Sequence, residues 1–154
     1  MLTLLLHNIR SVHNVGSIFR TADAAGVSEI ILSGYTPGPL DHLGHERRDF
    51  VKVSLGAESM VNWRRVATIT PALKKLKQEG YKIIAIEQDK RSAPLFSYKA
   101  RDKKIALLVG NEVKGISKSI LKHADTILEI PMRGKKESIN VSVAAGVALF
   151  TLLQ

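Results

Sequence analysis

Apolar positions along the chain form short runs, separated by segments in which apolar residues recur at helical spacing. The short runs have the length of buried strands, and we predict strands at residues 2–6, 29–33, 50–54, 81–87, 105–109 and 126–130. Because helical segments separate most of these strands, the pattern predicts an α/β fold with a mostly parallel sheet flanked by helices.

Boundary residues place the first two helices. Asn14 is the predicted N-cap of a helix whose apolar residues continue to Gly26, which ends it. Thr70 is the predicted cap of the second helix, with Pro71 at its first position and Gly80 after its end. Both helices lie between predicted strands, as an α/β layer structure requires.

The last predicted helix, from Asn140 onward, is apolar nearly all round, whereas a helix predicted at residues 117–123 is short. A helix that is apolar on every side must be covered on most sides. In a chain of 154 residues, we expect a partner subunit to supply part of that cover.

Residues 34–48 form a long loop rich in glycine and proline, and loops of this length in compact domains are usually functional or mobile. His42, His45 and Glu46 are spaced in a way that could suit a metal ion. The flanking glycine and prolines argue against a helix there, however, and no further ligand cluster is apparent, so no metal site is predicted. The basic residues at or just beyond the end of this segment indicate either charge that faces a polyanion or a solvated rim: Arg47, Arg48 and Lys52.

Composition narrows the class of protein. The length fits a single domain, and we expect residues 1–154 to form one domain with no added RNA-binding domain. The absence of cysteine excludes disulfides, thiolate metal sites and a cysteine nucleophile, and favours the reducing cytoplasm. No apolar run reaches the roughly 20 residues that span a bilayer, so no membrane partner is expected. The N-terminal apolar run lacks a basic lead-in and predicts a strand rather than a signal peptide.

The net charge of +9, from 23 basic and 14 acidic residues, favours a polyanionic partner. Many basic proteins bind no specific polyanion, so charge by itself does not decide between nucleic acid and no ligand. Candidate chemistry must therefore come from local motifs.

The first motif lies in the first predicted helix. His13, Gly16, Ser17 and Arg20 share a face that is distinct from the apolar stripe. A glycine inside a first turn costs about 1 kcal/mol relative to alanine, which suggests the close approach of a backbone or a ligand at Gly16. Arg20 offers a planar fork suited to phosphate or carboxylate. Taken alone, the segment is better explained as an ordinary amphipathic helix with a solvated arginine.

The second motif follows the strand at residues 105–109. A loop with glycines five apart, Gly110 and Gly115, contains the acidic Glu112. Ligands in α/β folds bind where the carboxyl ends of strands meet loops. The alternative is a strand-to-helix turn with a solvated carboxylate. A phosphate-binding loop is excluded because the required Gly-Lys-Ser/Thr ending is absent after Gly115.

The third motif begins where the last strand ends at Pro131, since proline cannot continue a central ladder. A basic turn then enters the final helix through Ser138 and Asn140, which are good capping residues with side chains available to a ligand. A capped helix after a basic turn would explain the segment without a ligand.

The three motifs in this order and spacing resemble those of the SpoU/TrmH family of RNA ribose 2′-O-methyltransferases, in the SPOUT class. The resemblance covers about residues 4–151. It implies a C-terminal deep trefoil knot, a homodimer, S-adenosylmethionine as the cofactor, and transfer of a methyl group to a ribose 2′-hydroxyl of RNA. The shortness of the chain favours tRNA over rRNA.

The resemblance also assigns site residues, position by position. The residues matched to catalytic positions are Arg20, Asn14, Glu112, Ser138 and Asn140. Those matched to three cofactor-binding loops are Ile86, Glu87, Gly110, Asn111, Glu112, Gly115, Ile130, Met132, Ser138, Ile139 and Asn140. The family proposal makes the arginine a base, which conflicts with a guanidinium pKa above about 12. We expect Arg20 instead to clamp the ribose-phosphate and to stabilise the developing alkoxide.

Two other functions are considered. A non-catalytic RNA-binding protein could keep the same fold, although intact Arg20, Glu112, Ser138 and Asn140 favour the enzyme. A dinucleotide-binding protein of the doubly wound class is disfavoured, because no Gly-x-Gly-x-x-Gly follows the first strand.

Overall fold

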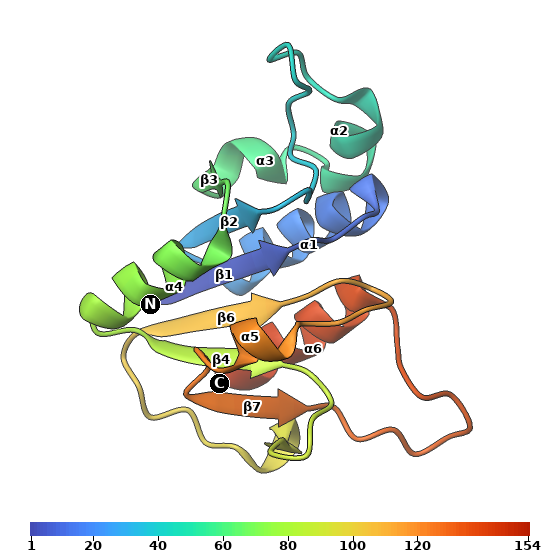
Figure 1. Ribbon diagram of the computed structural model, residues 1–154. Helices are drawn as coiled ribbons and strands as arrows, with labels where there is room; N and C mark the ends of the chain where they lie inside the picture. Colours follow the sequence, from blue (N-terminus) through green and yellow to red (C-terminus); the bar gives the residue numbers. More distant parts are fainter.

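A seven-stranded sheet with all neighbouring strands parallel forms the centre of the computed structural model, which describes residues 1–154 (Figure 1). The strand order is β3-β2-β1-β6-β4-β7-β5. The strands are β1 (Leu2–His7), β2 (Glu29–Ser33), β3 (Trp63–Val66), β4 (Lys82–Ile86), β5 (Ala93–Pro94), β6 (Ile105–Val109) and β7 (Thr126–Glu129). The helices are α1 (Val12–Ala25), α2 (Arg48–Ser54), α3 (Ala57–Met60), α4 (Ile69–Gln78), the 3-10 turn η1 (Leu95–Ser97), α5 (Lys118–Leu121) and α6 (Val141–Leu152).

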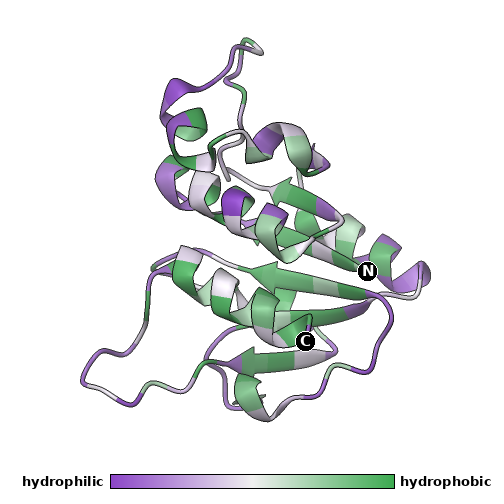
Figure 2. Cartoon of the chain, turned by 180° about the vertical axis from the view of Figure 1, so that it is seen from behind, coloured by the Kyte–Doolittle hydropathy of each residue, from purple (hydrophilic) through white to green (hydrophobic).

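Helices cover both faces of the sheet and divide the core into two clusters. On one face, Leu4 and Leu6 of β1 pack in a cluster with α1, α2 and α6, while Leu5 points to the other face, where α4 and α5 lie. Strands buried on both faces have continuous apolar runs instead of alternating ones. Figure 2 shows this as hydrophobic strands behind α1 and α6. The predicted fold class, a mostly parallel sheet flanked by helices, is confirmed.

The segment at residues 50–54 is part of helix α2, and the predicted strand is wrong. Phe50 packs edge-on against Phe19 of α1, with ring centroids 5.1 Å apart. A Cβ on Gly16 would lie 3.0 Å from the carbonyl oxygen of Phe50, so α1 and α2 approach closely at this glycine. The close approach predicted at Gly16 is therefore to a backbone. Five residues are too few for periodicity to separate a strand from a helical turn.

Two predicted caps also differ from the structure. The N-cap of α1 is Ser11, whose hydroxyl accepts a hydrogen bond from the Asn14 backbone N–H at 3.2 Å. The N-cap of α4 is Thr68 instead of Thr70. Several residues near each helix start have capping side chains, and only the backbone conformation selects one of them. Gly26 ends α1 in the left-handed conformation, as predicted.

Helix α6 packs on the sheet and on α1 through Ala145, Ala148 and Leu149, which are fully buried. Its opposite side is uncovered in the single chain, where Val143 and Phe150 each keep 52% of their surface exposed. None of the helices has the length and apolar character that crossing a membrane requires. The knot implied by the family resemblance concerns how the C-terminal segment threads, which the strand order does not define, and it stays a prediction.

Candidate active site

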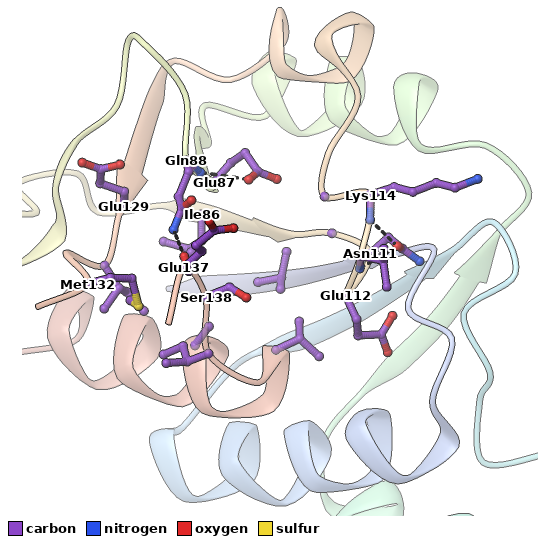
Figure 3. A pocket seen from close by; sticks show the side chains of 18 residues that line it. Ile86, Glu87, Gln88, Asn111, Glu112, Lys114, Glu129, Met132, Glu137 and Ser138 are labelled. Atoms are coloured by element: carbon purple, nitrogen blue, oxygen red, sulfur yellow. Dashed lines mark hydrogen bonds between the residues drawn. The ribbon is translucent and has the colours of Figure 1, made fainter. Parts of the chain in front are cut away.

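A pocket of about 330 Å³ lies at the carboxyl ends of β4, β6 and β7 (Figure 3). Its walls come from the loops that follow these three strands. All the residues predicted to bind the cofactor line it except Asn140, which stands at its edge as the N-cap of α6. The sequence did not identify eight further lining residues: Gln88, Val109, Val113, Lys114, Glu129, Glu137, Val141 and Ala144.

The loop after β6 closes on itself at Gly115. The N–H of Gly115 donates to the carbonyl of Asn111 at 3.0 Å, and Gly115 has a φ of +65°. The Glu87 carboxylate lies against Gly115 and accepts a hydrogen bond from the Ile116 N–H at 2.8 Å. A Cβ on Gly115 would overlap that carboxylate. The loop therefore needs glycine both for its backbone conformation and for the space.

The third wall comes from residues 130–139. The Gln88 side-chain amide donates to the Glu137 carbonyl at 2.6 Å, which joins this wall to the loop after β4. Ser138 lines the pocket, and its hydroxyl forms no hydrogen bond within the chain (Figure 3). It is available to a ligand.

The pocket has an acidic lining. Four carboxylates border it, with Lys114 as the only cation among the lining residues: Glu87, Glu112, Glu129 and Glu137. Such a lining favours a ligand that carries positive charge.

Glu112 binds to the start of α1. Its carboxylate accepts hydrogen bonds from the backbone N–H groups of Arg10, at 3.0 and 3.1 Å, and of Ser11, at 3.1 Å. Successive N–H groups at a helix N-terminus form a site for an anion. Burial by itself would raise the pKa of Glu112, but these hydrogen bonds, with those from its own N–H and from Asn14, hold that pKa below its ordinary value. The carboxylate is therefore ionised and fixed.

Asn14 extends this network to the third motif. Its side-chain amide donates to Glu112 Oε1 at 3.2 Å, and its Oδ1 accepts from the Asn140 amide at 3.1 Å. Asn140 in turn caps α6 by accepting from the Ser142 N–H at 2.8 Å. Three residues matched to catalytic positions are thus joined directly, and their contacts with each other are those of positioning residues.

Arg20 is not joined to this network. Its side chain is exposed on α1, does not line the pocket and forms no hydrogen bond or ion pair. Within one chain, the structure therefore brings together Asn14, Glu112, Ser138 and Asn140 but not Arg20.

The model of the SpoU rRNA Methylase family matches residues 1–150. The chain belongs to this family. A 23S rRNA (guanosine-2′-O-)-methyltransferase of Ralstonia nicotianae is 35% identical over 150 residues, which cover 97% of this SpoU chain and 57% of the relative. The chain spans roughly six tenths of the curated relatives it matches, as in an uncharacterised tRNA/rRNA methyltransferase of Mycoplasma pneumoniae, of which it covers 58%.

Solved structures agree with this membership. An AdoMet-bound rRNA methyltransferase from Sinorhizobium meliloti superposes with a TM-score of 0.85 at 28% identity, over 97% of the SpoU chain and 54% of that protein. A structure from work on 2′-OH methylation of C/U34 on tRNA superposes with a TM-score of 0.81 at 27% identity, over 97% of the SpoU chain and 92% of that protein.

Glu112→Gln in this SpoU chain is expected to lower the free energy of unfolding by about 2 kcal/mol near neutral pH, because it places an amide N–H against the N–H of Arg10 and removes charge from the remaining hydrogen bonds. The pKa of Glu112 is depressed in the folded state. The native carboxylate therefore stabilises the fold above its unfolded pKa, and this contribution is lost as the pH falls through the folded pKa.

Urea unfolding at a series of pH values measures both effects. The difference in the free energy of unfolding between the native protein and Glu112→Gln should be constant near neutral pH and should become smaller in acid. Glu46→Gln is the matched control, since Glu46 is exposed and its side chain has no partner. If Glu112→Gln lowers the free energy of unfolding no more than Glu46→Gln does, the structural role of the carboxylate is refuted.

Proposed function

We propose that this SpoU domain transfers a methyl group from S-adenosylmethionine to a ribose 2′-hydroxyl of RNA. The main support for this proposal is the pocket, where the loops after β4, β6 and β7 meet and contain the residues matched to cofactor-binding positions. The bound AdoMet of the Sinorhizobium meliloti relative supports the choice of cofactor.

The lining residues fit S-adenosylmethionine. The cofactor carries a sulfonium and an ammonium group, which suit the acidic lining, and Ile86, Ile130 and Ile139 supply apolar surface for its adenine. When bound, it supplies the electrophilic methyl group, and the chain supplies position and electrostatics. The Ser138 hydroxyl and the backbone of residues 110–115 are the groups available to orient it.

The reaction also requires that the ribose be held in place and that the proton of its 2′-hydroxyl be removed. A guanidinium does not act as a base at neutral pH. We assign Arg20 the role of a clamp on the ribose-phosphate that stabilises the developing alkoxide, with the proton leaving to a phosphate or to water. Since Arg20 does not line the pocket of its own chain, we infer that it serves the site of a partner subunit.

A homodimer follows from the same argument. The uncovered side of α6, with Val143 and Phe150, provides an apolar surface for the second copy. We expect the protein to sediment as a dimer at micromolar concentration and Phe150→Asp to sediment as a monomer, because a charge would be buried at the interface. Met60→Asp, at a residue that is 74% exposed on α3, is the control and should stay dimeric. A monomeric native protein would contradict the dimer.

For the substrate we propose tRNA, with rRNA as the alternative. The protein studied for C/U34 methylation on tRNA supports tRNA, because this chain covers 92% of it. The Ralstonia nicotianae relative, named for 23S rRNA, supports the alternative. We further propose that the protein acts in the cytoplasm and that its C-terminal segment has the family's knot.

Methyl transfer tests this proposal directly. The purified protein should bind S-adenosylmethionine by calorimetry and should move a labelled methyl group to tRNA, with the product located by mass spectrometry of ribose-methylated nucleosides. Transfer to rRNA instead of tRNA would favour the alternative substrate. RNA binding without cofactor binding or transfer would support a non-catalytic RNA-binding protein and refute the enzyme.

A further inference from the structure

A second hollow adjoins the cofactor pocket, on the other side of the loop after β6. It is lined by Arg10, Tyr35, Asn111, Val113 and Lys114, and three of these also line the cofactor pocket: Asn111, Val113 and Lys114. Its volume of about 430 Å³ lies within the range of small-molecule sites, roughly 300–1,000 Å³. A group held in this hollow would therefore lie beside a ligand in the cofactor pocket.

The hydroxyl of Tyr35 is fixed although its ring is open to solvent. The Asn111 amide donates to the Tyr35 hydroxyl at 3.0 Å and to the Asn8 carbonyl at 2.9 Å. The Asn111 carbonyl oxygen accepts from the N–H groups of Val113 and Lys114, at 2.9 and 2.7 Å. The Asn111 side chain, fixed by its bonds to Asn8 and to its own loop, thus holds the Tyr35 hydroxyl to the loop that separates the two hollows.

The backbone around Tyr35 is fixed as well. The Tyr35 N–H donates to the Asn8 side chain at 3.3 Å, and Arg65 donates to the carbonyls on either side, Gly34 at 3.3 Å and Thr36 at 2.6 Å. Asn8 itself has a φ of +55°, in the left-handed region that asparagine adopts more readily than most residues with a side chain. Yet 57% of the surface of Tyr35 is exposed. An aromatic ring held at both ends and left open is a preorganised surface for stacking.

The charge of this hollow is opposite to that of the cofactor pocket. Arg10 and Lys114 are both exposed, and neither side chain forms a hydrogen bond or an ion pair. No carboxylate lines the hollow. Figure 3 shows Lys114 extending away from the acidic residues of the cofactor pocket. Two unpaired cations beside an exposed ring suit a ligand with a flat base and a phosphate.

We propose that this hollow holds a nucleotide of single-stranded RNA, with its base stacked on Tyr35 and its phosphate contacted by Arg10 and Lys114. The inference rests on the proposed function, because a stacked nucleotide next to the cofactor pocket is the one whose ribose is presented for methylation. Stacking is tolerant of base identity, so Tyr35 supplies affinity and position rather than base selection.

The test uses the full chain and a short fluorescent oligouridine that contains one 4-thiouridine. Tyr35→Ala should weaken binding of this RNA about 10-fold, as expected for the loss of one base–aromatic stack. Tyr35→Phe should keep most of the affinity, because it retains the ring. Ultraviolet irradiation should cross-link the thiouridine to the peptide that contains Tyr35. Arg10→Ala and Lys114→Ala should each reduce the salt dependence of binding, by a slope of about 0.7 for each lost phosphate contact.

Matched controls are available on other surfaces. Phe96 is 59% exposed, so Phe96→Ala removes an equally exposed ring and should leave RNA affinity unchanged. Lys122 is exposed and its side chain has no partner, so Lys122→Ala should leave the salt slope unchanged. Calorimetry with S-adenosylmethionine should give the same affinity for Tyr35→Ala as for the native chain.

The outcomes separate the subsite from the proposed function. Unchanged RNA affinity in Tyr35→Ala, with methyl transfer intact in the native protein, overturns the subsite and leaves the enzyme. Cross-linking at Tyr35 in a protein that transfers no methyl group supports the subsite and refutes the enzyme. An equal loss of RNA and S-adenosylmethionine binding in Tyr35→Ala would mean that Tyr35 only supports the loop through Asn111, and it overturns the subsite.

Discussion

Gly115→Ala is expected to abolish measurable binding of S-adenosylmethionine. A Cβ at this position would overlap the Glu87 carboxylate, which is itself held by the N–H of Ile116. The left-handed φ of +65° adds backbone strain of about 1–2 kcal/mol for a residue with a side chain. Both effects displace the loop that forms one wall of the pocket, so affinity should fall by at least about 100-fold, or roughly 3 kcal/mol.

Calorimetry with S-adenosylmethionine measures the affinity, and thermal unfolding measures the accompanying loss of stability. Gly26→Ala is the matched control, because Gly26 has a φ of +73° and open space where its Cβ would lie. It carries the backbone strain without the overlap, and it is remote from the pocket. It should lose some stability and keep the native affinity. Native affinity in Gly115→Ala would disprove the assignment of this loop to the cofactor.

Arg20→Lys is expected to lower kcat/KM for RNA methylation by about 100-fold, because an ammonium cannot replace the two parallel hydrogen bonds of a guanidinium on a phosphate. Affinity for S-adenosylmethionine should not change, since Arg20 lies outside the pocket of its own chain. Arg101→Lys, at another exposed arginine, should keep native turnover. Near-native turnover in Arg20→Lys would reject the clamp.

Mixed dimers show which subunit Arg20 serves. When equal amounts of the Arg20→Ala and Gly115→Ala variants are refolded together, half of the dimers contain one chain of each. Each mixed dimer has one complete site only if Arg20 acts across the interface. Activity should then recover to about a quarter of the native value, given two sites in a symmetric dimer. If Arg20 acted within its own chain, no complete site would form and no activity would return.

Continuous apolar runs were sufficient to locate most of the sheet. The strands at residues 29–33 and 105–109 are found where they were predicted, and those of β1, β4 and β7 differ only at their ends. Strands β3 and β5 were not predicted, because they form the two edges of the sheet: β3 contains two arginines, and β5 has only two residues. Edge strands face solvent and lack the apolar run that marks a central one.

Local sequence was less informative where the same residues are compatible with several conformations. Ser11 and Asn14 can both cap a helix, and in the structure Ser11 has the extended backbone of a cap while the Asn14 side chain bonds to Glu112 and Asn140. The contact of Glu112 with Asn14 joins residues 98 positions apart. No periodicity or cap signal within a helix reports a partner at that distance.

The cofactor pocket could be predicted from motifs because loops after parallel strands gather at one edge of the sheet. The sequence alone therefore determined the α/β class and the loops that form the pocket. Only the tertiary structure decided that Glu112 binds the start of α1, that Asn111 holds Tyr35 beside the pocket, and that Arg20 lies away from it. These facts depend on which side chains meet across the sheet, and that follows from strand order and packing rather than from any local pattern of residues.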